Sequence, residues 1–84
     1  MRFYKNNELT LTNKNKIMVS YIEIVVTNTT QLTNFQKILT GYTFEANTET
    51  LTIKIELNSS ENFVLKNTGS STLQFKSITM FYEA

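Results

Sequence analysis

Residues 17–27, IMVSYIEIVVT, carry the pattern that decides the fold of this chain. Apolar side chains alternate with other residues first at Ile17 and Val19 and then, one residue out of step, from Ile22 onward. Alternation is typical of a β-strand with one buried face, because successive side chains point to opposite faces. The slip between Val19 and Ile22 predicts a β-bulge, since an extra residue keeps the later apolar side chains on the buried face.

The last long stretch, residues 73–82 (LQFKSITMFY), repeats this pattern at the same intervals. Its alternation also slips by one residue, between Phe75 and Ile78. The repetition predicts two long strands that are bent at the same level and pair side by side.

Shorter stretches with the same alternation fill most of the rest of the chain. Polar turns rich in Asn, Thr and Ser separate them. They lie at residues 2–5, 8–12, 42–46, 50–57 and 62–66. About seven or eight short strands with turns at regular intervals favour an antiparallel, jelly-roll-like β-sandwich. A small closed β-barrel is the alternative, because bulges bend strands in both architectures.

Residues 28–41 are the one segment that does not alternate. Its apolar residues are spaced by three or four, and they are Leu32, Phe35, Ile38 and Leu39. This period predicts a short helix around residues 32–39, with Thr30 or Thr33 as its N-cap and Gly41 at its end. The alternative is an irregular crossing loop that inserts the same side chains into the core.

Composition argues against catalysis. The 84 residues include no Cys, His or Asp, so the chain lacks a Ser-His-Asp triad, a thiol nucleophile and the usual zinc ligands. The usual calcium loops also require Asp. Glu45 and Glu56 are the one pair that resembles the two carboxylates of a glycosidase. Positions on the solvent-exposed face of two strands explain these residues better than a catalytic role does. We therefore expect a protein that is not an enzyme and that holds no metal and no cofactor.

Charge and hydropathy limit the partners of the chain. The formal net charge is +1, and the basic residues are scattered along the sequence, which argues against nucleic acid as a partner. No apolar run has the length of about 20 residues that a membrane span needs, so we expect no membrane insertion. No signal segment precedes the first strand pattern. Residues 1–84 are expected to form one β-sandwich domain, excised from a longer chain.

Three aromatic residues are candidates for ligand binding. Tyr4, Tyr21 and Phe81 fall out of phase with the inward residues of their own strands. Aromatic side chains on an outer face form a platform for sugar rings or a patch for another protein. The alternative is that the two long strands are buried on both faces, for example beneath residues 28–41.

The order of these patterns resembles that of a known group of domains. The chain opens with RFYKNNELTLT and closes with NFVLKNTGSSTLQFKSITMFY. It resembles small β-sandwich modules at the C-terminal end of secreted and surface proteins of Bacteroidetes and Firmicutes. At the start, Arg2, Tyr4 and residues 9–11 match the opening strand of those modules. At the end, Phe75, Ile78, Met80 and Tyr82 match the closing one. The resemblance implies an extracellular or cell-surface location as part of a larger protein, and it identifies no binding residues.

The sequence therefore predicts a non-catalytic accessory or adhesion-type binding module of a bacterial extracellular protein, with a glycan or a protein as its partner. The alternative function is a self-associating structural subunit of a phage or surface assembly. In that case the long bent strands would lie at sheet edges and pair between copies.

Overall fold

The computed structural model describes residues 2–82 of the chain. In chain order its elements are β1 (Arg2–Phe3), β2 (Glu8–Leu11), β3 (Val19–Val26), α1 (Thr29–Lys37), β4 (Thr43–Asn47), β5 (Thr52–Ser59), β6 (Phe63–Lys66) and β7 (Leu73–Tyr82). The prediction of an all-β chain with one short helix is confirmed.

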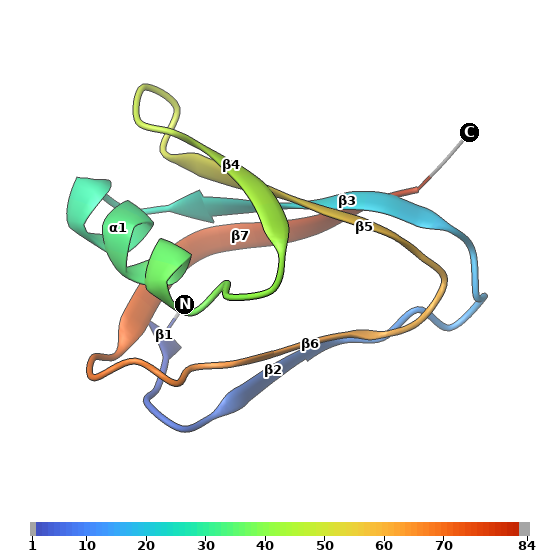
Figure 1. The fold of residues 1–84 in the computed structure, drawn as a ribbon, viewed down its shortest axis with the longest axis horizontal. Helices are drawn as coiled ribbons and strands as arrows, with labels where there is room; N and C mark the ends of the chain where they lie inside the picture. Colours follow the sequence, from blue (N-terminus) through green and yellow to red (C-terminus); the bar gives the residue numbers. More distant parts are fainter. Residues whose placement is uncertain (1, 83–84) are drawn as a thin grey trace.

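The strands form two antiparallel sheets that face each other (Figure 1). The larger sheet has five strands in the order β1-β7-β3-β5-β4, and the smaller sheet consists of β2 and β6. Within residues 2–82 the ladder does not run from one sheet into the other, so the fold is a sandwich and the closed-barrel alternative is wrong.

The two long strands pair as the sequence predicts. β3 and β7 are antiparallel neighbours in the larger sheet, with Ile22 opposite Met80 and Ile24 opposite Ile78. β5 pairs with the other side of β3, so β3 is an internal strand. The expectation that both long strands lie at sheet edges is therefore wrong for β3.

Both predicted slips are irregularities of this ladder. Val19 lies opposite Tyr82 and Tyr21 opposite Phe81, so Ser20 is the extra residue of one bulge. At the other end of the ladder Val25 and Val26 lie opposite Ser77 and Phe75, so Lys76 is the extra residue of the second. Because the strands are antiparallel, equal positions in the two sequences fall at opposite ends of the pair. The expectation of bends at the same level is wrong for this reason.

Residues 28–41 contain the predicted helix, which has a different N-cap from the predicted one. The carbonyl oxygen of the Asn28 side chain accepts a hydrogen bond of 2.9 Å from the Gln31 backbone N–H. Asn28 has extended backbone angles, as an N-cap requires, and neither Thr30 nor Thr33 occupies this position. The helix ends at Lys37, and Gly41 follows later with a φ of +91°.

The core lies between the sheets and is completed by the helix. Two strands cannot cover a five-stranded sheet, and α1 covers the part near β1 and the start of β7 (Figure 1). The Phe35 ring is fully buried there, with its centroid 6.5 Å from that of Phe3 and 6.0 Å from that of Phe75.

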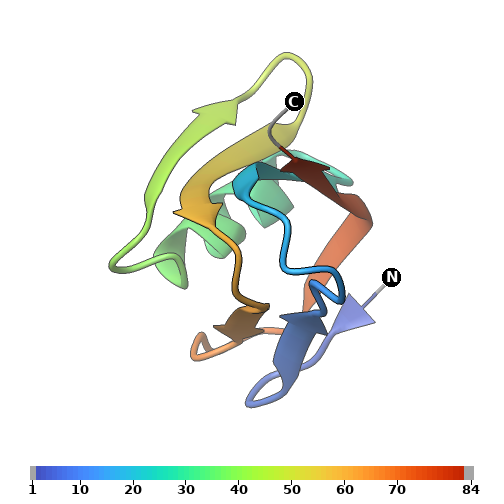
Figure 2. The same ribbon diagram turned by 90° about the vertical axis from the view of Figure 1, so that its right-hand side faces the viewer.

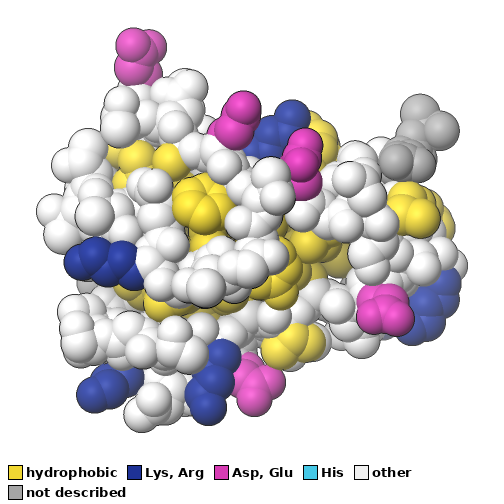
Figure 3. All heavy atoms as spheres, viewed as in Figure 1, with side chains coloured by type: hydrophobic (Ala, Val, Ile, Leu, Met, Phe, Trp, Pro, Cys, Tyr) yellow, Lys and Arg dark blue, Asp and Glu magenta, His cyan; other side chains and the backbone are white. Residues whose placement is uncertain are grey.

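Apolar side chains reach the surface between the layers on the side of β4 and β6 (Figure 1, Figure 3). Figure 3 shows apolar side chains gathered between the two layers on this side of the molecule. Tyr42 connects the layers here. Its ring lies 5.6 Å from that of Phe63, and its hydroxyl donates to the Val64 carbonyl at 3.4 Å.

The predicted strand limits differ from the observed ones by a few residues. Ile17 precedes β3 and is 44% exposed, although its alternation with Val19 indicates an inward position. Leu51 precedes β5 with a positive φ of 55°, because it closes the turn that joins β4 to β5.

Candidate functional site

The side of the five-stranded sheet that faces away from β2 and β6 is the candidate site, here called the outer face. Its side chains alternate with the buried residues of each strand, as period-two geometry requires. Its members are Thr43, Glu45 and Asn47 of β4, Thr52, Lys54 and Glu56 of β5, Tyr21, Glu23 and Val25 of β3, and Ser77, Thr79 and Phe81 of β7.

Neither the helix nor the second sheet covers the outer face. The buried residues of α1, Leu32 and Phe35, pack against the core on the opposite side of the larger sheet. The alternative in which residues 28–41 bury the long strands on both faces is therefore wrong. Figure 2 shows α1 and the β2–β6 layer on the inner side of the curved larger sheet.

Two of the three predicted binding residues meet on the outer face. Tyr21 and Phe81 are cross-strand partners of β3 and β7. Their ring centroids lie 4.5 Å apart with 11° between the ring planes, which is a stacked pair. The Lys54 ammonium lies 4.1 Å from the centroid of the Tyr21 ring, in a cation–π contact. Both rings are partly buried. The Tyr21 ring is in contact with both Phe81 and Lys54.

The third predicted residue, Tyr4, lies elsewhere. It follows β1, where its carbonyl accepts a hydrogen bond of 3.1 Å from Asn7, and its side chain is 51% exposed. β1 pairs with Leu73 and Gln74 at the start of β7, whereas Phe81 is near the end of that strand. At the rise of an extended strand, these two parts of β7 are roughly 25 Å apart. Tyr4 does not join the outer face.

Charged residues form a row beside the aromatic pair. Glu23, Lys54 and Glu45 lie opposite one another on β3, β5 and β4. Glu56 is the next outward residue of β5, between Thr43 and Tyr21. Three carboxylates and one ammonium group thus give this part of the face a negative balance.

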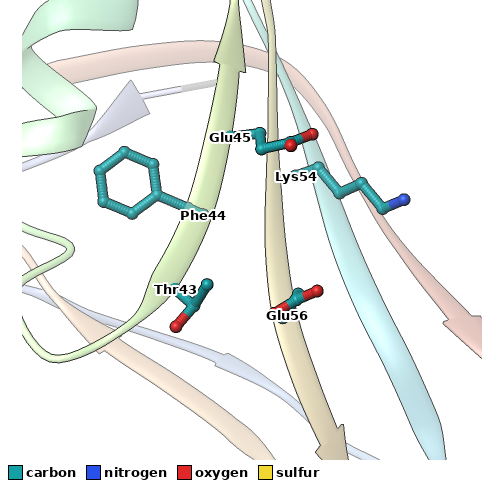
Figure 4. A pocket seen from close by; sticks show the side chains of 5 residues that line it. All are labelled: Thr43, Phe44, Glu45, Lys54 and Glu56. Atoms are coloured by element: carbon teal, nitrogen blue, oxygen red, sulfur yellow. The ribbon is translucent and has the colours of Figure 1, made fainter.

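Two open hollows lie over this row of charges. The first has a volume of about 190 Å³ and is lined by Thr43, Phe44, Glu45, Lys54 and Glu56. The second, of about 450 Å³, extends along β4 and β5 and includes Glu23. Figure 4 shows the Glu45 and Lys54 side chains pointing the same way from neighbouring strands, with Phe44 turned to the other side.

The arrangement of Glu45 and Glu56 is that of a solvated strand face. Glu45 lies opposite Lys54, and Glu56 is a diagonal neighbour of Glu45, a relation that places two residues about 7–8 Å apart. Both side chains are exposed on an open surface with Lys54 beside them. Nothing on this surface encloses a sugar ring between the two carboxylates.

Two structural findings bear on other kinds of site. Across residues 2–82, His, Cys, Asp and Glu side chains do not gather in any group of three or more that would hold a metal ion. The single helix of the described chain is too short and too polar to span a membrane.

The sequence does not single out Glu23 or Lys54 as a member of this site. The alternation of β5 places Lys54 on the outward face, but only the register of β3 against β5 brings it over Tyr21. A single sequence contains no signal for that register. The outward phase of Tyr21 and Phe81 was, in contrast, readable from their strands.

Comparisons of the chain with known proteins gave no match of any of three kinds. No protein-family model matches the chain. No curated protein matches it significantly. No solved structure matches its fold significantly.

Proposed function

We propose that this chain is a non-catalytic, accessory or adhesion-type binding module of a larger bacterial extracellular protein, and that its outer face binds a protein partner. One observation carries the proposal: an uncovered sheet face presents a stacked aromatic pair next to a row of charges. Aromatic side chains are enriched in the cores of protein interfaces, and charged residues in their surroundings set orientation and specificity.

The geometry of the aromatic pair favours a protein over a glycan. A sugar ring stacks on an open aromatic face, but Phe81 and Lys54 both contact the Tyr21 ring. Tyr21 and Phe81 are each only partly buried, so part of both side chains remains for contact with side chains of a protein partner. The negative balance of Glu23, Glu45 and Glu56 against Lys54 favours a partner with basic side chains.

The absence of catalysis is part of the proposal. Acid–base chemistry without His, Cys or Asp rests on Glu, Lys or Tyr. On the outer face, the Glu, Lys and Tyr side chains form a stacked aromatic pair and a row of charges, and this surface is open to solvent. The bacterial extracellular setting is supported by the resemblance of the opening and closing strand patterns to secreted modules.

Selection from a displayed library of random peptides tests the proposal. Peptides that bind the outer face should be rich in Lys and Arg, and their binding should weaken in high salt. Tyr21→Ala should weaken binding roughly tenfold or more, as expected for a buried aromatic at an interface. Tyr4→Ala is the matched control, because this exposed tyrosine lies away from the outer face, and it should bind normally.

Two results would overturn the proposal. Selected peptides that bind equally to the wild type and to Tyr21→Ala would exclude the outer face. Binding on a glycan array that Tyr21→Ala abolishes, with no peptide selected, would replace the protein partner with a glycan.

A further inference from the structure

One side of β7 has no strand beside it over most of its length. β1 pairs only with Leu73 and Gln74, and β3 occupies the other side. Among the described residues no strand pairs with the outer edge of residues 77–82. Figure 2 shows the end of β7 at the border of the larger sheet. A strand edge of this kind presents a row of free backbone N–H and C=O groups.

The Ser20 side chain shows which of these groups point outward. Its hydroxyl donates a hydrogen bond of 3.0 Å to the Phe81 carbonyl, so this carbonyl points toward β3. Backbone groups of alternate residues in an antiparallel strand point to opposite sides. The N–H and C=O groups of Ile78, Met80 and Tyr82 therefore point to the free edge.

The other described edges carry protection that this one lacks. β4 has Glu45 at its centre, and β2 begins with Glu8. β6 ends with Lys66, and the Tyr42 hydroxyl already contacts its Val64 carbonyl. Residues 77–82, SITMFY, contain no charged residue, no Pro and no Gly. Charges and Pro are what keep exposed edges apart, so this edge is open to pairing.

We propose that residues 78–82 of β7 pair with the same segment of a second copy of this chain, antiparallel and about a two-fold axis. An antiparallel edge is complementary to itself, because a two-fold rotation brings its own donors opposite its own acceptors. An uncharged segment also meets its copy without like-charge repulsion. The proposal is independent of what binds to the outer face.

One register uses all three outward residues. With Met80 opposite Met80 of the second copy, Ile78 lies opposite Tyr82, and every outward N–H and C=O of these residues gains a partner. Tyr82, which is 48% exposed in the single chain, packs beside Ile78 of the second copy. The two larger sheets become continuous, and their outer faces lie side by side.

Sedimentation over a concentration series tests the pairing with two matched variants. Thr79→Lys places a charge on the outer-face side of the edge strand, opposite Phe81 of the second copy in this register. Glu23 lies directly opposite within the chain, so the fold should tolerate the substitution. Thr43→Lys places the same charge on the exposed edge strand at the far side of the same sheet. We expect the wild type and Thr43→Lys to dimerise alike, and Thr79→Lys to associate at least about tenfold more weakly. A wild type that remains monomeric up to millimolar concentration would overturn the proposal.

Amide hydrogen exchange tests the register separately. The amides of Thr79 and Phe81 should be protected at all concentrations, because they bond to β3. The amides of Ile78, Met80 and Tyr82 should exchange rapidly in dilute protein and become protected in concentrated protein. A dimer in which these three amides stay unprotected would show that another surface holds it together.

Discussion

At the scale of single residues, two buried asparagines hold the loops of the sandwich. Asn67 is fully buried, and its side-chain amide donates to the carbonyls of Phe3 and Ser71 at 2.9 Å each. Its side-chain oxygen accepts from the Gly69 N–H at 3.1 Å. Asn13 has the same role in the loop between β2 and β3, where its side-chain amide donates to the Ile17 and Ser60 carbonyls.

Asn67→Ala should therefore destabilise the fold by about 2–3 kcal/mol, because it leaves buried backbone groups without partners. Urea unfolding followed by circular dichroism measures the loss. Asn15→Ala is the control, since Asn15 is exposed in a turn, and it should change stability by less than about 0.5 kcal/mol. Equal losses in the two variants would contradict the role of Asn67.

The sequence predicts these residues only as members of polar turns. Asn is abundant in this chain, and nothing local distinguishes Asn67 or Asn13 from the exposed copies. Their burial depends on contacts between segments far apart in the chain, such as the bond from Asn67 to Phe3. The outward phase of Tyr21 and Phe81 is local information, whereas their stacking with each other and with Lys54 depends on strand register.

At the scale of elements, the alternation slips were the most informative feature of the sequence. They correspond to the bulges at Ser20 and Lys76 in the β3–β7 ladder. The prediction that the two bulges lie at the same level was wrong, because neither stretch alone indicates that the two strands run antiparallel. The helix was predictable from the spacing of its buried stripe, but its limits were not, since Asn28 and two nearby threonines are all acceptable caps.

The cap assignment makes a prediction for α1. Asn28→Ala should cost about 1 kcal/mol of stability, because the Gln31 N–H loses its acceptor. Thr30→Ala, inside the first turn, should change the urea midpoint little. The assignment would be wrong if Thr30→Ala were the more damaging of the two.

At the scale of the whole molecule, the fold is a sandwich whose two layers differ in size. A two-stranded sheet leaves part of the five-stranded sheet uncovered, and α1 fills this space with Phe35. The sequence indicates two facing layers through one-sided alternation. It does not divide the strands between the layers, because that division depends on which strands pair.

Phe35→Ala should cost about 3–5 kcal/mol, since it empties the space between Phe3 and Phe75. A domain of this length has a total stability of about 4–12 kcal/mol, so the variant should be strongly destabilised or unfolded. Phe44→Ala, at a half-buried position of β4, should cost clearly less. Urea unfolding of both variants measures the difference, and equal costs would contradict the role of the helix in the core.

The pairing of β3 with β7 supports the rest of the account, because it creates both the outer face and the free edge. Nuclear Overhauser contacts in dilute, isotope-labelled protein measure it most directly. We predict cross-strand contacts between Ile22 and Met80 and between Ile24 and Ile78. Contacts in a shifted register, such as Ile24 with Met80, or no contacts between the two strands, would contradict the account.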